Sequence, residues 1–240
     1  GDHIGDMDLL REAFDVPIWG SDYTSQTVEC DRILNDGDIL QLGKQEWTVL
    51  ITPGHHPGHV CLSSPAGIVA GDMVAGIGTI LIPPGTGDMD VYIEQLERLR
   101  ELKPHLLFPS HGPVIPLPEK TLSYYIKHRK QRHQKVLEAV EFGHKTISAI
   151  ATMAYSDSPD AHPGLAQDQT LAHLVSHELK SCIRNVSDLL TWTQEDAKET
   201  DNFNGSNHLQ LMEEKVEKME NLLVQLEQYK NIAHTSFKNK

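Results

Sequence analysis

The stretch Thr48-Val49-Leu50-Ile51-Thr52-Pro53-Gly54-His55 passes from an apolar strand pattern into a tight turn that ends in a histidine. Gly71-Asp72 follows the apolar run Gly67–Ala70 in the same way. Pro109-Ser110-His111-Gly112 follows the run His105–Phe108. Glycine and proline in such turns hold the next side chain in a defined direction. Because the carboxyl ends of strands in a layered sheet can point into one crevice, the pattern predicts an α/β fold with these residues gathered at one edge.

Strand and helix patterns alternate along the first two-thirds of the chain. Short runs of strand-forming residues, separated by turn residues, predict strands over Asp38–Leu42, Glu46–Thr52, His59–Ser63, Gly67–Ala70 and His105–Phe108. Helical apolar spacing predicts helices over Asp8–Phe14, Met89–Leu102, Pro118–Phe142, Thr146–Ala154 and Leu165–Lys180. One face of the second of these helices carries Ile93, Leu96, Leu99 and Leu102, and Pro104 ends the pattern.

The composition is that of a globular chain without a membrane span. The 240 residues are 39% hydrophobic, a normal globular fraction once glycine is added, and no apolar run approaches the ~18 residues that a span needs. The formal net charge of −13 repels nucleic acid at long range. The 3 cysteines are too few for a disulfide framework, which fits a reducing compartment. We therefore expect a cytoplasmic location, or the mitochondrial matrix if the protein is eukaryotic.

The chain divides into four expected segments. These are a first domain over 1–117, a long helix with a winged-helix-like region over 118–195, a polar linker over 196–207, and a helix over 208–230. The last helix has apolar residues at alternating spacings of three and four, which is a heptad seam: Leu209, Met212, Val216, Met219, Leu223 and Leu226. The seam predicts either a homodimer through 209–226 or a helix folded back on the body of the protein.

The segments that carry histidine and aspartate suit a divalent metal ion. Neutral imidazole and carboxylate are ligands that Zn²⁺ takes on rigid supports, and histidine is the commonest metal ligand. Together with Asp2-His3 near the start, the strand-end segments supply both groups, in Asp2, His3, His55, Asp72 and His111. Iron and manganese accept the same ligand types, so the pattern does not select one metal.

In their order and spacing, these segments resemble the motifs of the metallo-β-lactamase-fold hydrolase superfamily, and within it those of the β-lactamase-like protein 2 branch. Asp2-His3 match the end of the family's His-x-His-x-Asp-His motif, and His55 matches its Thr-Pro-Gly-His motif. Asp72 matches its Gly-Asp motif, and His111 matches its Pro-x-His-Gly motif. The resemblance covers about Gly1–Lys180. It implies a four-layer αββα sandwich, truncated at the N-terminus, with a small winged-helix-like C-terminal region and a helical tail.

The resemblance also implies a role for each of these residues in a site of two zinc ions. The ligands of the second ion correspond to Asp2, His3, Asp72 and His111. Asp72 bridges the two ions, and His55 belongs to the first. Asp2 is the candidate for orienting the attacking water or accepting its proton. The first two histidines of the opening motif are absent from the given sequence, and if the chain is a fragment, we expect its upstream sequence to end in His-x-His directly before Gly1.

Other polar residues near these motifs have structural interpretations. We expect His56 to face solvent and His59 to satisfy a local hydrogen bond rather than to bind metal. Cys61 is expected in the core as a small apolar residue. The basic run 127–133 has two interpretations. In the first, it binds a phosphate of RNA or of a coenzyme A thioester. In the second, it forms a solvated helix face that pairs with acidic neighbours such as Glu94, Glu97 and Glu101.

The residues and the resemblance together predict a metal-dependent hydrolase that uses a metal-activated water on a small-molecule thioester or ester. A single-strand-specific endoribonuclease is a second hypothesis, disfavoured by the net charge and by an aromatic content of only 6%. A non-catalytic, self-associating module is a third, because part of the first metal site is missing and a heptad tail is present. Metal content separates the enzymes from the module, and a substrate panel separates the two enzymes.

Overall fold

The computed structural model describes residues 7–176 together with Met212 and Val216. The chain divides into two compact units, 1–132 and 133–240. The domain boundaries expected at 117, 195 and 207 stay predictions. The linker 196–207 lies outside the described residues, as does the heptad helix 208–230 except for Met212 and Val216, which are both helical. None of the helices in the described part has the length and hydropathy needed to cross a membrane.

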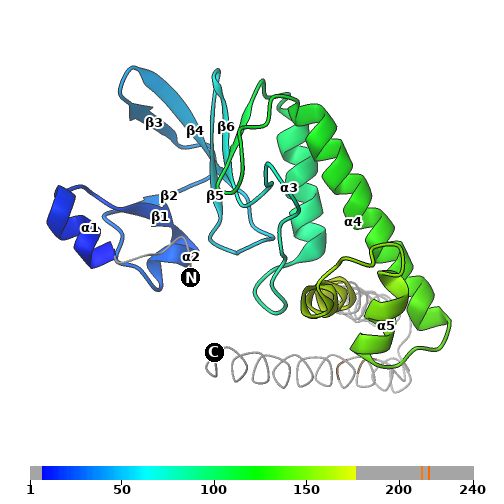
Figure 1. Ribbon diagram of the computed structural model, residues 1–240. Coiled ribbons are helices and arrows are strands. Elements are labelled where there is room, and N and C mark those ends of the chain that lie inside the picture. The colour runs from blue at the N-terminus through cyan, green and yellow to red at the C-terminus, as the bar shows by residue number, and fades with distance from the viewer. Residues whose placement is uncertain (1–6, 177–211, 213–215, 217–240) are drawn as a thin grey trace, which may run out of the picture. The chain divides into compact units, whose positions relative to one another are not determined.

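The main sheet of the first unit has five strands in the order β3-β4-β5-β6-β7 (Figure 1). The strands cover Ile39–Leu42, Gln45–Ile51, Val60–Ser64, Gly67–Gly71 and Leu107–Pro109. From β3 to β6 each strand is antiparallel to the next, and β7 joins β6 in parallel. All five strands lie where the sequence predicted them, to within two residues at either end.

The β3–β4 hairpin turns on Gly43-Lys44, where Gly43 has a φ of +63°. Glycine adopts this left-handed conformation at little cost because it has no Cβ. The turn pairs Leu42 with Gln45 and thereby fixes the register of the two strands. Farther along the sheet, Leu50 of β4 pairs with Cys61 of β5, and both are buried, as expected for Cys61.

Helix α3 (Met89–Glu101) and the first part of α4 (Pro118–Glu141) lie on one side of the main sheet (Figure 1). The carboxylate of Asp88 caps the first N–H groups of α3. The buried face of this helix consists of Met89, Tyr92, Ile93, Leu96 and Leu99. Leu102, which the spacing placed on the same face, is 48% exposed instead. The reason is that α3 ends there and the chain leaves it at Lys103, where φ is +48°.

The residues before the main sheet form a small α/β region that the sequence predicted only in part. Helix α1 (Met7–Phe14) is the expected first helix. Strands β1 (Trp19–Ser21) and β2 (Arg32–Leu34) form a parallel two-stranded sheet, with the short helix α2 (Asp22–Ser25) between them. Three residues are too few to show an alternating pattern, which is why these strands were not expected.

In the second unit, the elements described between 133 and 176 are all helical. Helix α4 continues to Glu141, and Gly143 follows with a φ of +97°, as expected for a helix end. Helix α5 (Ile147–Ala154) begins at its cap residue Thr146, and a further helix begins at 163 and extends to the end of this described range. The buried cluster of α4 and α5 consists of Val136, Ala139, Ile150 and Ala154. The winged-helix-like region stays a prediction.

Leu96→Ala should lower the free energy of unfolding by about 2–5 kcal/mol, because it removes a fully buried side chain of α3 and leaves a cavity. Leu102→Ala is the matched control at the exposed end of the same helix and should cost less than about 1 kcal/mol. Urea denaturation followed by circular dichroism measures both values. Equal losses in the two variants would contradict this packing of α3.

Candidate functional site

Three of the predicted metal ligands meet at one edge of the main sheet. His55 comes after β4, Asp72 directly after β6, and His111 after β7. Asp72 Oδ2 lies 3.4 Å from His55 Nε2, and Asp72 Oδ1 lies 3.4 Å from His111 Nε2. The Asp72 side chain is only 8% exposed, whereas that of His111 is 53% exposed. The cluster therefore opens to solvent on the His111 side.

The turn that carries His55 is held against α3. Gly54 has a φ of +127°, and a Cβ at this position would lie 2.4 Å from the Cα of Tyr92. The Gly54 carbonyl accepts the N–H of Asp88, the cap residue of α3, at 2.7 Å. His55 Nδ1 lies 2.7 Å from the carbonyl oxygen of Leu81. Since a carbonyl only accepts, Nδ1 carries a proton, and Nε2 is the ring nitrogen on the side of Asp72.

Backbone hydrogen bonds at the ends of β6 and β7 bring Asp72 and His111 together. The N–H of Ser110 donates to the carbonyl of Gly71 at 3.1 Å, and the N–H of Gly76 donates to the carbonyl of His111 at 2.8 Å. Gly71 has a φ of +51°, a conformation that most side chains disfavour. The direction of the Asp72 carboxylate is therefore set by the turn at the end of β6.

The donor set fits a divalent ion in its chemistry, because it combines one buried carboxylate with two imidazoles. Asp72 stands between the two imidazoles with one oxygen toward each, which suits the bridging role that the resemblance implies. Among the residues that the structure describes, no three His, Cys, Asp or Glu side chains form a metal-binding group, and the two imidazoles face different oxygens of Asp72. Asp2 and His3 lie outside the described residues. The assignment of all five ligands stays a prediction.

Comparison with known protein families identifies the domain that carries this cluster. Residues 1–111 match the family model of the Metallo-beta-lactamase superfamily. The chain carries a metallo-beta-lactamase superfamily domain. This result confirms the family that the motifs predicted.

Curated relatives of two kinds match the chain. A Beta-lactamase-like protein 2 homolog from Drosophila melanogaster is 34% identical over 143 residues, which are 55% of this chain and 48% of the relative. A hydroxyacylglutathione hydrolase from Bdellovibrio bacteriovorus is 30% identical over 114 residues, which are 46% of this chain and 45% of the relative. The chain thus spans about half the length of the curated relatives it matches.

Solved structures support the fold of the metallo-beta-lactamase domain. A beta-lactamase domain protein from Burkholderia ambifaria is 26% identical, with a TM-score of 0.51 over 61% of this chain and 46% of that protein. A metallo-beta-lactamase family protein from Thermus thermophilus has a TM-score of 0.51 at 23% identity, over 60% of this chain and 47% of that protein. The predicted α/β fold class is confirmed, while the truncation at the N-terminus stays a prediction.

His56 and His59 lie in the loop between β4 and β5 of the metallo-beta-lactamase domain. His59 makes the expected local hydrogen bonds, since its Nε2 lies 2.9 Å from the backbone N of Asp72 and its Nδ1 lies 2.8 Å from Thr52 Oγ1. His56 was expected to face solvent, but it is half-buried because its ring packs edge-on against Tyr23. Burial lowers the pKa of His56, since it removes water from the charged form.

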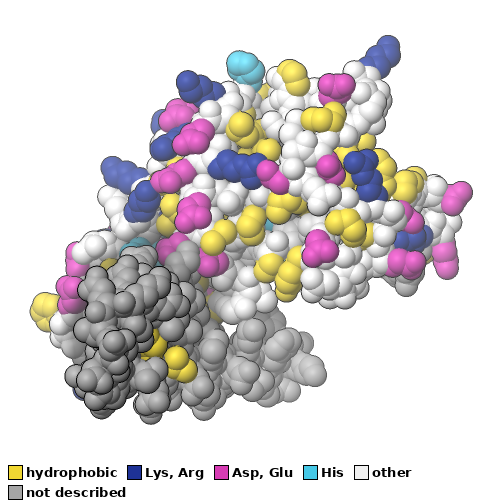
Figure 2. All heavy atoms as spheres, turned by 180° about the vertical axis from the view of Figure 1, so that it is seen from behind, with side chains coloured by type: hydrophobic (Ala, Val, Ile, Leu, Met, Phe, Trp, Pro, Cys, Tyr) yellow, Lys and Arg dark blue, Asp and Glu magenta, His cyan; other side chains and the backbone are white. Residues whose placement is uncertain are grey.

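The basic run 127–133 on α4 is divided between surface and interior. Lys130 forms an ion pair with Glu97 of α3 at 2.7 Å, as the structural interpretation predicted. Arg129 and Arg132, by contrast, are only 2% and 5% exposed, so they cannot meet a phosphate at the surface. On the face shown in Figure 2, acidic and basic side chains are interspersed rather than gathered by sign.

Arg129 supports the candidate site from inside the fold. Its guanidinium lies 5.6 Å from the centre of the Tyr92 ring and donates to the carbonyl of Ile80. The next carbonyl along the chain, that of Leu81, is the one that orients His55. Sequence reasoning missed this role because a basic residue in a helix has the same spacing whether it points outward or inward.

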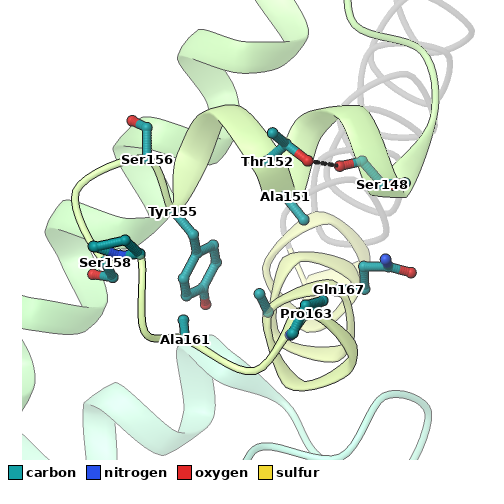
Figure 3. A pocket seen from close by; sticks show the side chains of 11 residues that line it. Ser148, Ala151, Thr152, Tyr155, Ser156, Ser158, Ala161, Pro163 and Gln167 are labelled. Carbon is teal, nitrogen blue, oxygen red and sulfur yellow. Dashed lines mark hydrogen bonds between the residues drawn. The ribbon is translucent and has the colours of Figure 1, made fainter.

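A separate hollow of about 450 Å³ lies in the second unit, between α5 and the helix that begins at 163 (Figure 3). The described residues that line it are Ser148, Ala151, Thr152, Tyr155, Ser156, Ser158, Pro159, Ala161, Pro163, Ala166 and Gln167. Most of these are hydroxyl-bearing or small, and none is His, Cys, Asp or Glu. The hollow therefore offers no side chain that a catalytic metal prefers, and the cluster around Asp72 is the candidate site.

Cys61 should resist iodoacetamide in the native chain at pH 8. Burial hides its sulfur and raises the pKa of the thiol to about 12, so the reactive thiolate is scarce at this pH. The half-buried Cys30 should react first, and both should react in urea. Mass spectrometry of the peptides measures the labelling. Labelling of Cys61 in the native chain as fast as that of Cys30 would contradict the burial of Cys61 in β5.

Proposed function

We propose that the protein is a metal-dependent hydrolase that acts on a thioester or ester. The observation that carries the proposal is the buried Asp72 carboxylate, with one oxygen facing His55 and the other facing His111. Carboxylate and imidazole are the ligands that hydrolytic metal ions take. The relatives named hydroxyacylglutathione hydrolase are, by that name, thioester hydrolases, which supports an acyl thioester as the substrate class.

Each candidate ligand would have its own role in binding the ion or in the reaction. His55, whose Nδ1 donates to a backbone carbonyl, would hold the ion through the lone pair of Nε2. Asp72 offers one oxygen on the side of His55 and the other on the side of His111. Asp2 would orient the attacking water or take its proton, and His3 would add a ligand. A bound divalent ion supplies the Lewis acidity that makes a hydroxide available near neutral pH.

We propose zinc as the metal, with two ions in the complete site. Iron and manganese are alternatives, because imidazole and carboxylate ligands suit all three metals. The proposed partner is a small-molecule thioester or ester. A cytoplasmic location and a homodimer through 209–226 stay predictions from the sequence.

No observation favours the endoribonuclease over the thioester hydrolase. Burial of Arg129 and Arg132 removes two cations from the surface that would meet a phosphate backbone. The net charge of −13 acts in the same direction. An assay of thiol release and RNA cleavage distinguishes the endoribonuclease and the non-catalytic module from the thioester hydrolase.

Asp72→Ala should lose bound zinc more completely than His55→Ala, because Asp72 faces both imidazoles whereas His55 faces one oxygen. Zinc affinity in Asp72→Ala should fall by more than about tenfold, as measured by elemental analysis after dialysis against buffered zinc. His105→Ala is the matched control, since His105 is exposed and lies outside the cluster. Equal zinc content in Asp72→Ala and His105→Ala would overturn the ligand assignment.

The zinc-loaded chain should release free thiol from an S-acylglutathione or an acyl-coenzyme A, which a chromogenic thiol reagent measures. It should leave single-stranded RNA intact on a denaturing gel. RNA cleavage without thiol release would replace the thioester proposal by the endoribonuclease. Tight zinc binding with neither activity would favour the non-catalytic module.

A further inference from the structure

His59 uses both of its ring nitrogens on residues next to the candidate site. Its Nε2 lies 2.9 Å from the backbone N of Asp72, and its Nδ1 lies 2.8 Å from Thr52 Oγ1. The N–H of Asp72 can only donate, so Nε2 must be the acceptor. A neutral imidazole with a bare Nε2 carries its proton on Nδ1, and that proton goes to the hydroxyl of Thr52.

The hydroxyl of Thr52 continues this chain of hydrogen bonds into the core. Thr52 and Cys61 are both 0% exposed, and Thr52 Oγ1 lies 3.3 Å from Cys61 Sγ. A hydroxyl that accepts from His59 still has its own proton to donate to the sulfur. Cys61 Sγ in turn lies 3.5 Å from the carbonyl of Ala70, two residues before Asp72. The chain of contacts thus starts and ends on the turn that carries Asp72.

Gly71 lets the His59 ring sit directly against this turn. A Cβ at Gly71 would lie 2.5 Å from His59 Nε2, and Gly71 has a φ of +51°. The absence of a side chain therefore allows Nε2 to reach the N–H of the next residue, Asp72. The ring also lies edge-on to the His55 ring, with the ring centres 6.3 Å apart.

We propose that His59 is a positioning residue, which directs the Asp72 carboxylate between His55 and His111 and binds neither metal nor substrate. This inference rests on the proposed function, since the carboxylate it positions is the proposed ligand. The reason that His59 is not itself a ligand is its single lone pair. A neutral imidazole has one acceptor nitrogen, and in His59 that nitrogen holds the backbone of Asp72.

The first test uses the unaltered chain without metal, at one fixed pH. The ¹⁵N chemical shifts of the His59 ring should show a protonated Nδ1 and a bare Nε2, and the Asp72 amide should exchange slowly with solvent. Addition of zinc should leave the His59 tautomer unchanged. The opposite tautomer, a rapidly exchanging Asp72 amide, or transfer of His59 Nε2 to zinc would each overturn the proposal.

The second test compares two variants at the same position. His59→Phe keeps an aromatic ring but removes the acceptor, and zinc affinity should fall by about 10–100-fold, as measured by competition with a chromophoric chelator. His59→Gln places an amide oxygen near the position of Nε2, and it should recover most of the affinity and the slow exchange of the Asp72 amide. Unchanged zinc affinity in His59→Phe, or no recovery in His59→Gln, would contradict the positioning role.

Thr52→Val and Thr52→Ser test the same chain of hydrogen bonds without touching the His59 ring. Thr52→Val removes the hydroxyl with little change in volume and should weaken zinc binding and the preference for the Nδ1–H tautomer, whereas Thr52→Ser should keep both. Equal behaviour of the two variants would overturn the role of the hydroxyl. These readouts do not require turnover. If the chain binds zinc but hydrolyses no substrate, the proposed function fails, while the tautomer and amide exchange still decide the role of His59.

Discussion

The common direction of β4, β6 and β7 is the constraint on which the candidate site depends. Strand β5 is antiparallel to both β4 and β6, so β4 and β6 run the same way, and β7 joins β6 in parallel. All three strands therefore end at one edge of the main sheet, and the turns that follow them deliver His55, Asp72 and His111 to one place. Because side chains alternate along a strand, a slip of one residue in the strand pairing would move these three side chains away from one another.

Burial of the Asp72 carboxylate at that edge requires compensation, since an isolated charge is costly to remove from water. In the proposed site, a divalent ion held between the Asp72 oxygens and the two imidazoles that face them would supply this compensation. His59 holds the backbone N–H of Asp72. Behind them, Arg129 binds the segment whose carbonyl orients His55. The geometry of the site is thus tied to packing of the main sheet against α3 and α4, and a change in that packing would move the donor atoms.

The type of reaction and the choice of substrate rest on different parts of the molecule. The metallo-beta-lactamase superfamily domain over 1–111 brings together a carboxylate and imidazoles, and such a donor set suits hydrolysis by a metal-activated water. Substrate choice depends on the surface around the site, which varies among proteins of one fold. The thioester proposal therefore draws on the names of relatives of which this chain spans about half the length.

The sequence by itself determined the strands of the main sheet, the helices other than α2, and three candidate ligands, because alternation, helical spacing and turn residues act over a few neighbouring positions. It missed β1, β2 and the helix α2 between them, which are too short to carry a pattern. Only the tertiary structure decided that Arg129 points inward and that His59 binds the backbone of Asp72. Spacing along a helix shows which residues share a face but not what covers that face. The tautomer of His59 depends on an atom 13 positions away in the chain, which only folding brings within 2.9 Å.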